Sequence, residues 1–437
     1  MKKALFVLTI ALGTRAFAQV TISGISSGGF MATQMGVIYS EEISGVGTVA
    51  GGFFYCAQNH LQNKIQEGIQ THLGKQNLFL FNQNKGLYSD LLLGRFLFPG
   101  YSTKWFTPSP MNPIYQSVGV CMQNPDKAEL PDLKAFHEKK LIDDPSYLTK
   151  QNIFTYHGEH DNVVLFKMAQ KIKDFYIENK IPIEQIQQKS LQFAGHSFAT
   201  DKQDLQPCTA EKFPFITSCQ YDLAFDLLTF LTKKELKREP FEAKNLYYVD
   251  QTLDLKNLDI MNPERGAQPT PSIAPYGYLY SSNECLQNPT YCQLHVALHG
   301  CEMSDSFDID FDAKYTEQVQ KTRIVEMRKE KSKILGFKSL PYIKQKKIRN
   351  GTFKFAQFSG YSEYAIKNNI MILYPQTWIT EDNYPYNPKG CWDWFGWTNE
   401  NYATNQGLET SWLMQLIRSV KNNPTQHLLK IRPQFKK

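Results

Sequence analysis

Short runs of apolar residues alternate along the chain with longer segments in which apolar residues recur every three or four positions. The first pattern is typical of buried β-strands, and the second is typical of helices with one apolar face. These patterns predict strands at 19–23, 152–156, 189–193, 294–298 and 370–374, and helices at 30–37, 164–179, 222–231 and 408–420. Short strands separated by helices favour a mostly parallel sheet with helices on both faces, so the predicted fold class is α/β.

The pentapeptide Gly24-Ile25-Ser26-Ser27-Gly28 lies between the first predicted strand and the first predicted helix. A strand, a sharp turn and a helix form the context of a nucleophile elbow, in which a serine hydroxyl stands exposed above a sheet. The flanking glycines remove Cβ atoms that would clash in so tight a turn. Ser26 is therefore the candidate nucleophile of a serine hydrolase.

A serine nucleophile needs a base to take its proton and an acid to orient that base. In hydrolases of this architecture the chain order is Ser, then Asp or Glu, then His, each after a strand. Asp161 follows the predicted strand 152–156, and His196 follows the predicted strand 189–193. The joint order predicts a triad of Ser26, Asp161 and His196.

Each of these residues also has an alternative interpretation. Asp161 could cap the helix that follows it, which is a common role for a loop aspartate. His196 could be a surface histidine, and His157, His160 and His299 compete with it for the role of base.

A tetrahedral intermediate needs two backbone N–H donors for its oxyanion. Ser27, directly after the nucleophile and at a helix N-terminus, is the expected first donor. The second usually comes from an H-G-x turn after an earlier strand. Here the turn His299-Gly300-Cys301 follows a later strand, so it stands on the unexpected side of Ser26 in the sequence. This mechanism implies no metal and no organic cofactor.

The N-terminal residues 1–18 resemble a secretory signal peptide, with two lysines, an apolar stretch at 4–12 and a small-x-small cleavage site ending at Ala18. That apolar stretch is too short to span a bilayer, and no later apolar run is long enough. We therefore expect an exported, soluble protein with a single domain at 19–437.

The eight cysteines form an even set, which suits an oxidising compartment, and they include no C-x-x-C motif. The close pairs Cys208 with Cys219 and Cys285 with Cys292 predict local disulfides. The full connectivity stays open, because eight cysteines allow 105 pairings.

The net charge of +6 over 437 residues does not demand a nucleic-acid partner. Basic residues concentrate at about 308–355, a helix-prone stretch that we interpret as a surface insertion. The alternative is a basic patch that docks an anionic surface, granule or membrane.

Taken together, the motifs resemble those of the secreted polyhydroxybutyrate (PHB) depolymerases, which are built on a circularly permuted α/β-hydrolase fold. The resemblance covers nearly the whole mature chain. It rests on these motifs, in chain order: Gly24-Ile25-Ser26-Ser27-Gly28-Gly29, His157-Gly158 with Asp161, Gly195-His196, His299-Gly300-Cys301, Tyr374-Pro375-Gln376-Thr377 and Gly390-Cys391-Trp392-Asp393-Trp394.

The resemblance implies hydrolysis of the ester bonds of PHB or its oligomers by Ser26, Asp161 and His196. It also implies oxyanion donors at Ser27 and Cys301. The aromatic motif would line the substrate cleft through Trp392 and Trp394, although at least one of these or Trp397 should be structural. Because Cys301 and Cys391 both lie beside proposed site elements, we predict a disulfide between them.

Two segments, at about 308–355 and 71–117, are larger than a compact family member needs, so polymer specificity is less firmly implied than ester hydrolysis. The rival functions are a feruloyl or acetyl-xylan type of carboxylesterase and a secreted binding protein without catalysis. The expected location is extracellular or periplasmic.

Overall fold

The computed structural model describes residues 20–58, 115–251, 253, 272–274, 276–305, 353–379, 387 and 389–429. The predicted signal peptide lies outside these residues, as do the predicted basic insertion up to residue 352 and the segment 71–114. The division into a signal peptide and one domain stays a prediction. Among the described residues, no helix is both long and apolar enough to cross a membrane.

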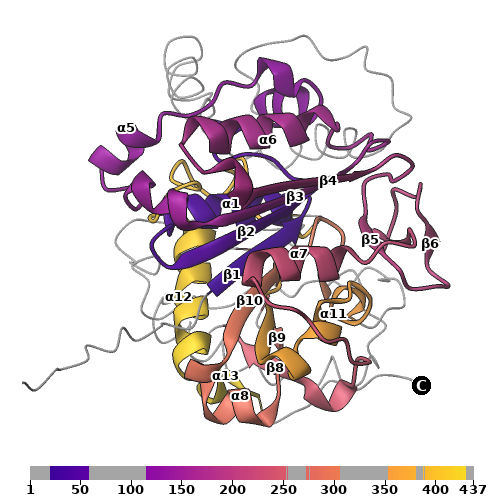
Figure 1. Ribbon diagram of the computed structural model, residues 1–437. Helices are drawn as coiled ribbons and strands as arrows, with labels where there is room; N and C mark the ends of the chain where they lie inside the picture. Colours follow the sequence, from indigo (N-terminus) through magenta and orange to yellow (C-terminus); the bar gives the residue numbers. More distant parts are fainter. Residues whose placement is uncertain are drawn as a thin grey trace, which may run out of the picture.

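An eight-stranded sheet forms the centre of the molecule, with the strand order β4-β3-β2-β1-β10-β11-β9-β8 (Figure 1). The strands are β1 (Val20–Ile25), β2 (Ile43–Val49), β3 (Asn152–Gly158), β4 (Ile186–Leu191), β8 (Leu246–Asp250), β9 (Tyr276–Tyr280), β10 (Gln293–Leu298) and β11 (Ile370–Tyr374). The neighbours from β4 to β11 are parallel, whereas β9 is antiparallel to both β11 and β8. The sheet is therefore mostly parallel, as the sequence predicts.

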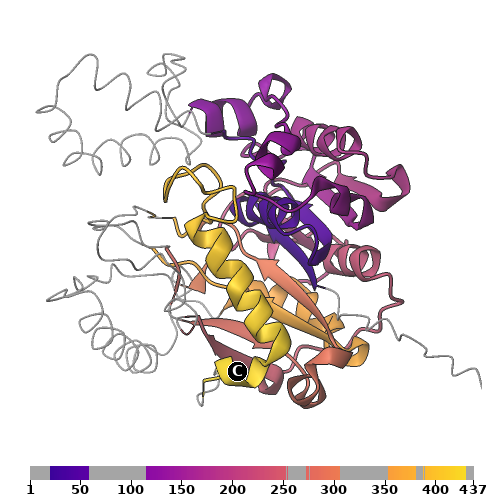
Figure 2. The ribbon, with the colours of Figure 1, turned by 90° about the vertical axis from the view of Figure 1, so that its left-hand side faces the viewer.

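Helices cover both faces of this sheet (Figures 1 and 2). One face carries α1 (Ser27–Ile38), α6 (Lys167–Glu178) and α12 (Leu408–Asn422), and the other carries α7 (Leu223–Thr232) and α11 (Lys354–Phe358). The shorter helices are α5 (Leu133–Glu138), α8 (Asn283–Gln287), α13 (Pro424–His427) and a π-helix (Tyr115–Met122). Short 3-10 helices span Pro125–Lys127, Pro145–Lys150, Ile183–Gln185, Ala243–Asn245, Pro289–Tyr291, Tyr361–Tyr364 and Ile366–Asn368.

A second, smaller sheet has the strand order β5-β7-β6 and follows β4 in the chain. It consists of β5 (Phe198–Thr200), β6 (Gln206–Pro207) and β7 (Ile216–Ser218). Its strands are only two or three residues long and escape the sequence patterns.

The central strands bury side chains on both sides. In β11, Met371 and Leu373 pack in the core beneath α1 and α12, whereas Ile370, Ile372 and Tyr374 pack in the core beneath α7 and α11. The sequence of a strand buried on both faces is a continuous apolar run, so the position of the strand can be predicted.

The predicted strands lie in β1, β3, β4, β10 and β11, and the predicted helices lie in α1, α6, α7 and α12. The boundary of β4 was wrong, because this half-buried edge strand begins with the polar stretch that follows Ile186. Strand β2 was missed because glycine has low β propensity. A Cβ atom on Gly47 would lie 2.9 Å from Cδ1 of Leu227, so the glycine lets α7 pack closely on this strand.

The strand order shows how the site is assembled. β1 comes first in the chain but lies in the middle of the sheet, between β2 and the much later β10. The parallel strands β1, β3, β4 and β10 all end at the same edge. Residues after these strands therefore gather there, including Ser26, Asp161, His196 and the turn after Leu298.

Candidate active site

Ser26 occupies a strained turn between β1 and α1. Its φ of 56° and ψ of −123° lie outside the regions that serine normally adopts, a strain of about 1–3 kcal/mol. The Ser26 N–H is held by the carbonyl of Val49 on β2, at 2.9 Å. A Cβ atom on Gly24 would lie 2.3 Å from the carbonyl oxygen of Gly28, and one on Gly28 would lie 2.4 Å from that of His299. Both glycines are therefore needed for this tight turn.

The hydroxyl of Ser26 does not cap the helix that follows it. Ser26 is the N-cap residue of α1, a position where serine usually caps the helix with its side chain, yet it makes no such bond here. Its side chain is half-buried and has no hydrogen-bond partner among the described residues. Bonds between a nucleophile and its base are often long without substrate and tighten when substrate binds.

Asp161 and His196 are joined directly. Oδ2 of Asp161 lies 2.7 Å from Nδ1 of His196. Oδ1 accepts the backbone N–H groups of Val163 and Val164, each at 2.8 Å. Asp161 therefore stabilises its own turn, while its other oxygen orients the imidazole. It does not cap the following helix, because α6 begins only after Phe166 and has no side-chain cap.

The surroundings of His196 favour its protonated form. Burial is the largest influence on its pKa and lowers it. The charge of Asp161, the hydrogen bond to Asp161 and the charge of Glu211 together outweigh burial and raise the pKa above its usual value. An imidazole stabilised as an imidazolium in this way is suited to accept a proton from a serine hydroxyl.

The three competing histidines have other surroundings. Burial lowers the pKa of His157 to about 4, so it stays neutral. The ring of His160 bonds the carbonyl of Gln192 and is exposed. Both ring nitrogens of His299 bond within the H-G-x turn and its neighbour. Of these four histidines, His196 is the one bonded to a carboxylate side chain.

The turn after β10 lies directly against the nucleophile. A Cβ atom on Gly300 would lie 3.2 Å from Cβ of Ser26. Nε2 of His299 accepts the N–H of Thr377 at 3.2 Å, so the ring proton is on Nδ1, which donates to the carbonyl of Gly300 at 2.8 Å. Burial lowers the pKa of His299 to about 4 and keeps this ring neutral.

That hydrogen bond sets the direction of the next amide. The C=O and N–H groups of one trans peptide point in opposite directions. Because His299 holds the carbonyl of Gly300, the N–H of Cys301 faces away from the imidazole. Ser27, the first residue of α1, has an N–H without an intrahelical partner, as at every helix N-terminus.

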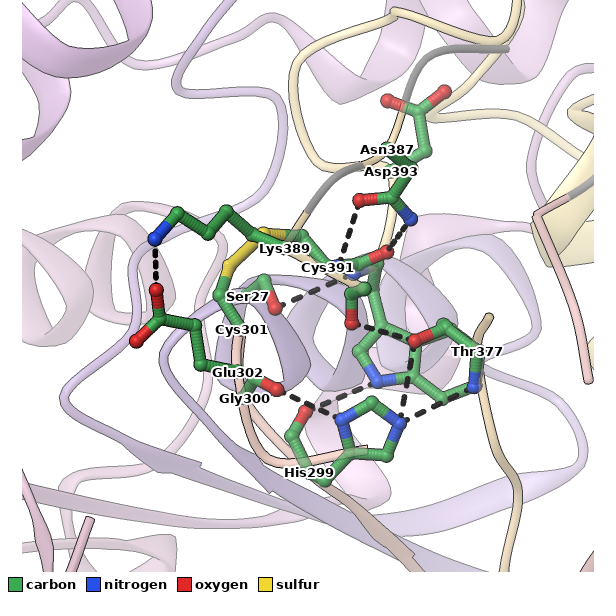
Figure 3. Close-up of a disulfide and its surroundings, with 12 residues drawn as sticks. Ser27, His299, Gly300, Cys301, Glu302, Thr377, Asn387, Lys389, Cys391 and Asp393 are labelled. Atoms are coloured by element: carbon green, nitrogen blue, oxygen red, sulfur yellow. Dashed lines mark hydrogen bonds and ion pairs between the residues drawn. A yellow bond between two sulfur atoms is a disulfide. The ribbon is translucent and has the colours of Figure 1, made fainter. Parts of the chain in front are cut away.

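The predicted disulfide between Cys301 and Cys391 is present, which confirms this pairing (Figure 3). Beside it, Lys389 forms an ion pair with Glu302 and its carbonyl accepts the N–H of Glu302 at 2.7 Å. Asn387 brackets Cys391, accepting its N–H at 2.9 Å and donating to its carbonyl at 2.8 Å. The turn at 299–301, named the oxyanion turn for its proposed role, and the aromatic loop at 389–398 are thus joined at several points.

The remaining cysteines are also paired. The local pairs Cys208–Cys219 and Cys285–Cys292 are as predicted. The structure adds Cys56–Cys121, which sequence spacing did not indicate, and leaves no free cysteine among the eight.

Trp392 lies inside the molecule, with 0% of its surface exposed. Its indole N–H donates to the carbonyl of His299 at 3.0 Å, and its ring stacks on Trp412. It therefore supports the oxyanion turn, in the structural role expected of at least one tryptophan in this motif. A contact between Trp392 and substrate stays a prediction.

The other aromatic residues of the loop are less enclosed. Trp394 is 6% exposed and stacks on Phe30, with ring centroids 4.2 Å apart. Phe395 and Trp397 are half-buried and pack against each other at 4.8 Å. Phe395 was not singled out from sequence, although it stands between two tryptophans.

Two further residues of the site were given no role by the sequence. The buried carboxylate of Asp393 accepts the N–H groups of Gly396, Trp397 and Thr398, so it shapes the aromatic loop. Glu211 accepts the backbone N–H of His196 and that of Asn162, the residue after Asp161. Asp393 lies in the aromatic motif quoted above, where its function was not predicted, and Glu211 lies in none of the quoted motifs.

The fold is that of an α/β-hydrolase, and Ser26 lies in the tight turn between β1 and α1 where such a fold places its nucleophile elbow. Two solved structures share the fold with 22% sequence identity. A PHB depolymerase complexed with an R3HB trimer has a TM-score of 0.59, covering 93% of this chain and 98% of that one. The PHB depolymerase from Penicillium funiculosum has a TM-score of 0.57, covering 93% and 96%.

Two curated proteins are also similar to this chain in sequence. The chain is 23% identical over 412 residues to a poly(3-hydroxybutyrate) depolymerase of Delftia acidovorans, and 23% identical over 411 residues to a polyhydroxybutyrate depolymerase of Talaromyces funiculosus. Each alignment covers 92% of this chain. The chain spans 60% of the length of the first relative and 89% of the second. No protein-family model matches. The resemblance to PHB depolymerases predicted from sequence is thereby confirmed.

Proposed function

We propose that this protein is a secreted serine esterase that hydrolyses the ester bonds of poly(3-hydroxybutyrate) or its oligomers. The observation that carries the proposal is the 2.7 Å bond between His196 and Asp161 at the sheet edge where Ser26 occupies its strained turn. The names of the relatives support the polyester substrate.

In the first step His196 accepts the proton of the Ser26 hydroxyl through Nε2 as the oxygen attacks the ester carbonyl carbon. Asp161 holds Nδ1–H of the imidazole and stabilises the imidazolium. The carbonyl oxygen gains the negative charge and is held by the N–H groups of Ser27 and Cys301. Loss of one such donor typically costs roughly 10²–10³ in rate.

In the second step the imidazolium protonates the departing alcohol, which leaves an acyl group on Ser26. Water then enters, gives its proton to His196 and attacks the acyl carbon. Collapse of this second intermediate returns the proton to Ser26 and releases the acid. These side chains account for every proton, so the proposed chemistry uses no metal or organic cofactor.

The polymer would lie along the aromatic loop. Trp394, Phe395 and Trp397 bring flat apolar rings to the loop that the disulfide ties to the oxyanion turn. Such rings pack well on aliphatic ester repeats. We propose that the protein acts outside the cytoplasm, extracellularly or in a periplasm, where its four disulfides are stable. A contact of the basic insertion with an anionic surface stays a prediction.

The test compares the clearing of amorphous PHB with the release of ferulate and acetate. Wild type is measured beside Ser26→Ala and the control Ser44→Ala, whose hydroxyl bonds the carbonyl of Val20 at the opposite end of the sheet. We expect clearing by wild type and by Ser44→Ala, and none by Ser26→Ala. Full activity in Ser26→Ala would remove the hydrolase mechanism. Ferulate or acetate release without clearing would point to a plant-wall esterase, and no ester hydrolysis at all would favour a binding protein.

A further inference from the structure

A small loop closed by the disulfide Cys208–Cys219 lies beside the triad. It begins directly after β6, includes β7 and packs along the residues around His196. The carbonyl of Cys208 accepts the N–H of Gly195 at 3.1 Å, and the carbonyl of Phe215 accepts the N–H of Phe198 at 2.7 Å. Two backbone bonds therefore fix the loop on either side of His196.

Glu211, within this loop, bonds both segments that carry the acid and the base. Its Oε1 accepts the backbone N–H of His196 at 3.0 Å and that of Asn162 at 2.7 Å. Its Oε2 accepts the side-chain amide of Asn162 at 3.2 Å. Asn162 directly follows Asp161, so one carboxylate joins two loops that leave different strands of the sheet. Hydrogen bonds to an ionised carboxylate are stronger than those between neutral groups.

The residues around Glu211 leave space for its side chain. A Cβ atom on Gly195 would lie 2.7 Å from Cγ of Glu211, so glycine makes room for the glutamate stem. From the same loop, the ring of Phe215 meets the His196 imidazole edge to face, with centroids 6.3 Å apart. The imidazole is thus held by Asp161 at Nδ1, by Glu211 at its backbone and by Phe215 at its ring.

We propose that Glu211 is a positioning residue for catalysis. It holds His196 and the loop of Asp161 in the relative position that brings the imidazole to Asp161. This inference rests on the proposed function, because it assigns His196 as the base. Asp161 and His196 follow neighbouring strands, and the nearest backbone bond between their loops, from His160 to the carbonyl of Ala194, lies before His196. Glu211 provides the link at His196 itself.

The carboxylate also acts on the charge of the base. The groups that face His196 are Asp161 and Glu211, which both favour the imidazolium, and His157, which stays neutral. Loss of the Glu211 charge removes one of the influences that raise the pKa of His196. The base would then lose its proton at lower pH, and the acid limb of activity would move to lower pH.

The test uses the full chain with Glu211→Gln and Glu211→Ala. The control Glu159→Gln removes the same charge from the same sheet edge, at a side chain that bonds Ser190. Hydrolysis of p-nitrophenyl butyrate gives kcat and KM across pH. The imidazole Nδ1–H proton resonance of His196 reports the bond to Asp161 without catalysis.

We expect Glu211→Ala to lose about 10²-fold in kcat with little change in KM, as a small misplacement of a catalytic group does. Glu211→Gln, which keeps one acceptor oxygen, should lose about 10-fold and shift the acid limb to lower pH. Glu159→Gln should match wild type in both respects. The Nδ1–H resonance should weaken in Glu211→Ala.

Wild-type kcat, an unmoved acid limb and an unchanged resonance in both Glu211 variants would overturn the proposal. If Glu211→Ala does not fold, Glu211→Gln still tests the proposal, through the acid limb of its pH–activity profile and through the Nδ1–H resonance of His196. A wild type that hydrolyses p-nitrophenyl butyrate but clears no PHB contradicts the proposed substrate and leaves this test intact. If no ester is hydrolysed, the resonance still shows whether Glu211 positions His196.

Discussion

At the residue scale, the proposed chemistry depends on side chains whose two polar atoms are both held by hydrogen bonds. Asp161 uses one oxygen for its own turn and the other for His196. His299 uses one nitrogen for Thr377 and the other for Gly300. A group fixed in this way loses little further freedom when the transition state forms, which is the benefit of preorganisation.

The pH dependence follows from His196. This residue must be neutral to accept a proton, and its raised pKa means that it stays protonated to higher pH than an ordinary histidine. Activity should therefore fall as pH falls through a midpoint above about 6.5, the usual value for histidine. The measurement is kcat/KM for a small ester against pH. A midpoint near 4 would instead point to His157 or His299, whose pKa values burial lowers to about 4.

His299 provides a second prediction at this scale. His299→Ala removes the bond to the carbonyl of Gly300, so the Cys301 N–H loses its fixed direction. We expect kcat to fall by about 10²–10³, with KM nearly unchanged, because the donor acts on the transition state.

The control for His299 is His295→Ala. His295 is also a buried histidine of this segment, but its ring bonds Thr21 and Ser23 inside the sheet. This change should lower the free energy of unfolding and leave kcat per folded molecule close to wild type. Equal loss of kcat in both variants would show that the effect comes from removing any buried histidine. It would then not come from the orientation of the Gly300–Cys301 peptide.

At the scale of elements, two loops that are far apart in sequence form one unit. The oxyanion turn and the aromatic loop share the disulfide Cys301–Cys391, the ion pair of Glu302 with Lys389 and the indole bond of Trp392. These links add to the bonds that His299 makes with Thr377 and Gly300, so the aromatic loop helps to fix the position of the turn. This explains why a buried tryptophan occurs in a motif that sequence alone connects with substrate.

The disulfide can be tested by replacing both cysteines, Cys301→Ser with Cys391→Ser. It closes a loop of 90 residues, so its loss should lower the free energy of unfolding by up to about 4–5 kcal/mol. Activity should fall further than the unfolded fraction explains, because the Cys301 N–H moves. The measurements are thermal unfolding and kcat on a small ester.

The matched control replaces Cys285 and Cys292 by serine. This pair closes a loop of 7 residues between α8 and β10, so a smaller loss of stability and a normal kcat per folded molecule are expected. If both double variants lost kcat equally, the disulfide at the turn would have no special role in catalysis.

The same scale shows which elements sequence could predict. Central strands such as β10 and β11 are buried on both faces, and their continuous apolar runs were found. β2 is equally central, but close packing of α7 requires glycine there and removes the apolar signal. β4, a half-buried edge strand, carries polar residues and was placed too late in the chain.

At the scale of the whole molecule, the order of strands in the sheet brings together site residues that are far apart in the chain. Strand β1, before the proposed nucleophile, comes first, and strand β10, before the proposed oxyanion turn, comes after the proposed base. The two strands nevertheless pair in parallel, from Val20 with Leu294 to Gly24 with Leu298. The ends of the two strands therefore meet whichever strand is made first. In this permuted chain order, strand pairing and not sequence order brings the two turns together.

The sequence by itself determined which residues could do this chemistry and where the main strands lie. These are local properties: a glycine-flanked serine after a strand, an apolar run, a histidine after a glycine. Only the tertiary structure decided which histidine bonds Asp161, that Glu211 joins the two loops and that Trp392 is buried. The physical reason is that these contacts join residues on different strands and loops, and their distances are set by strand register and packing, which no local pattern records.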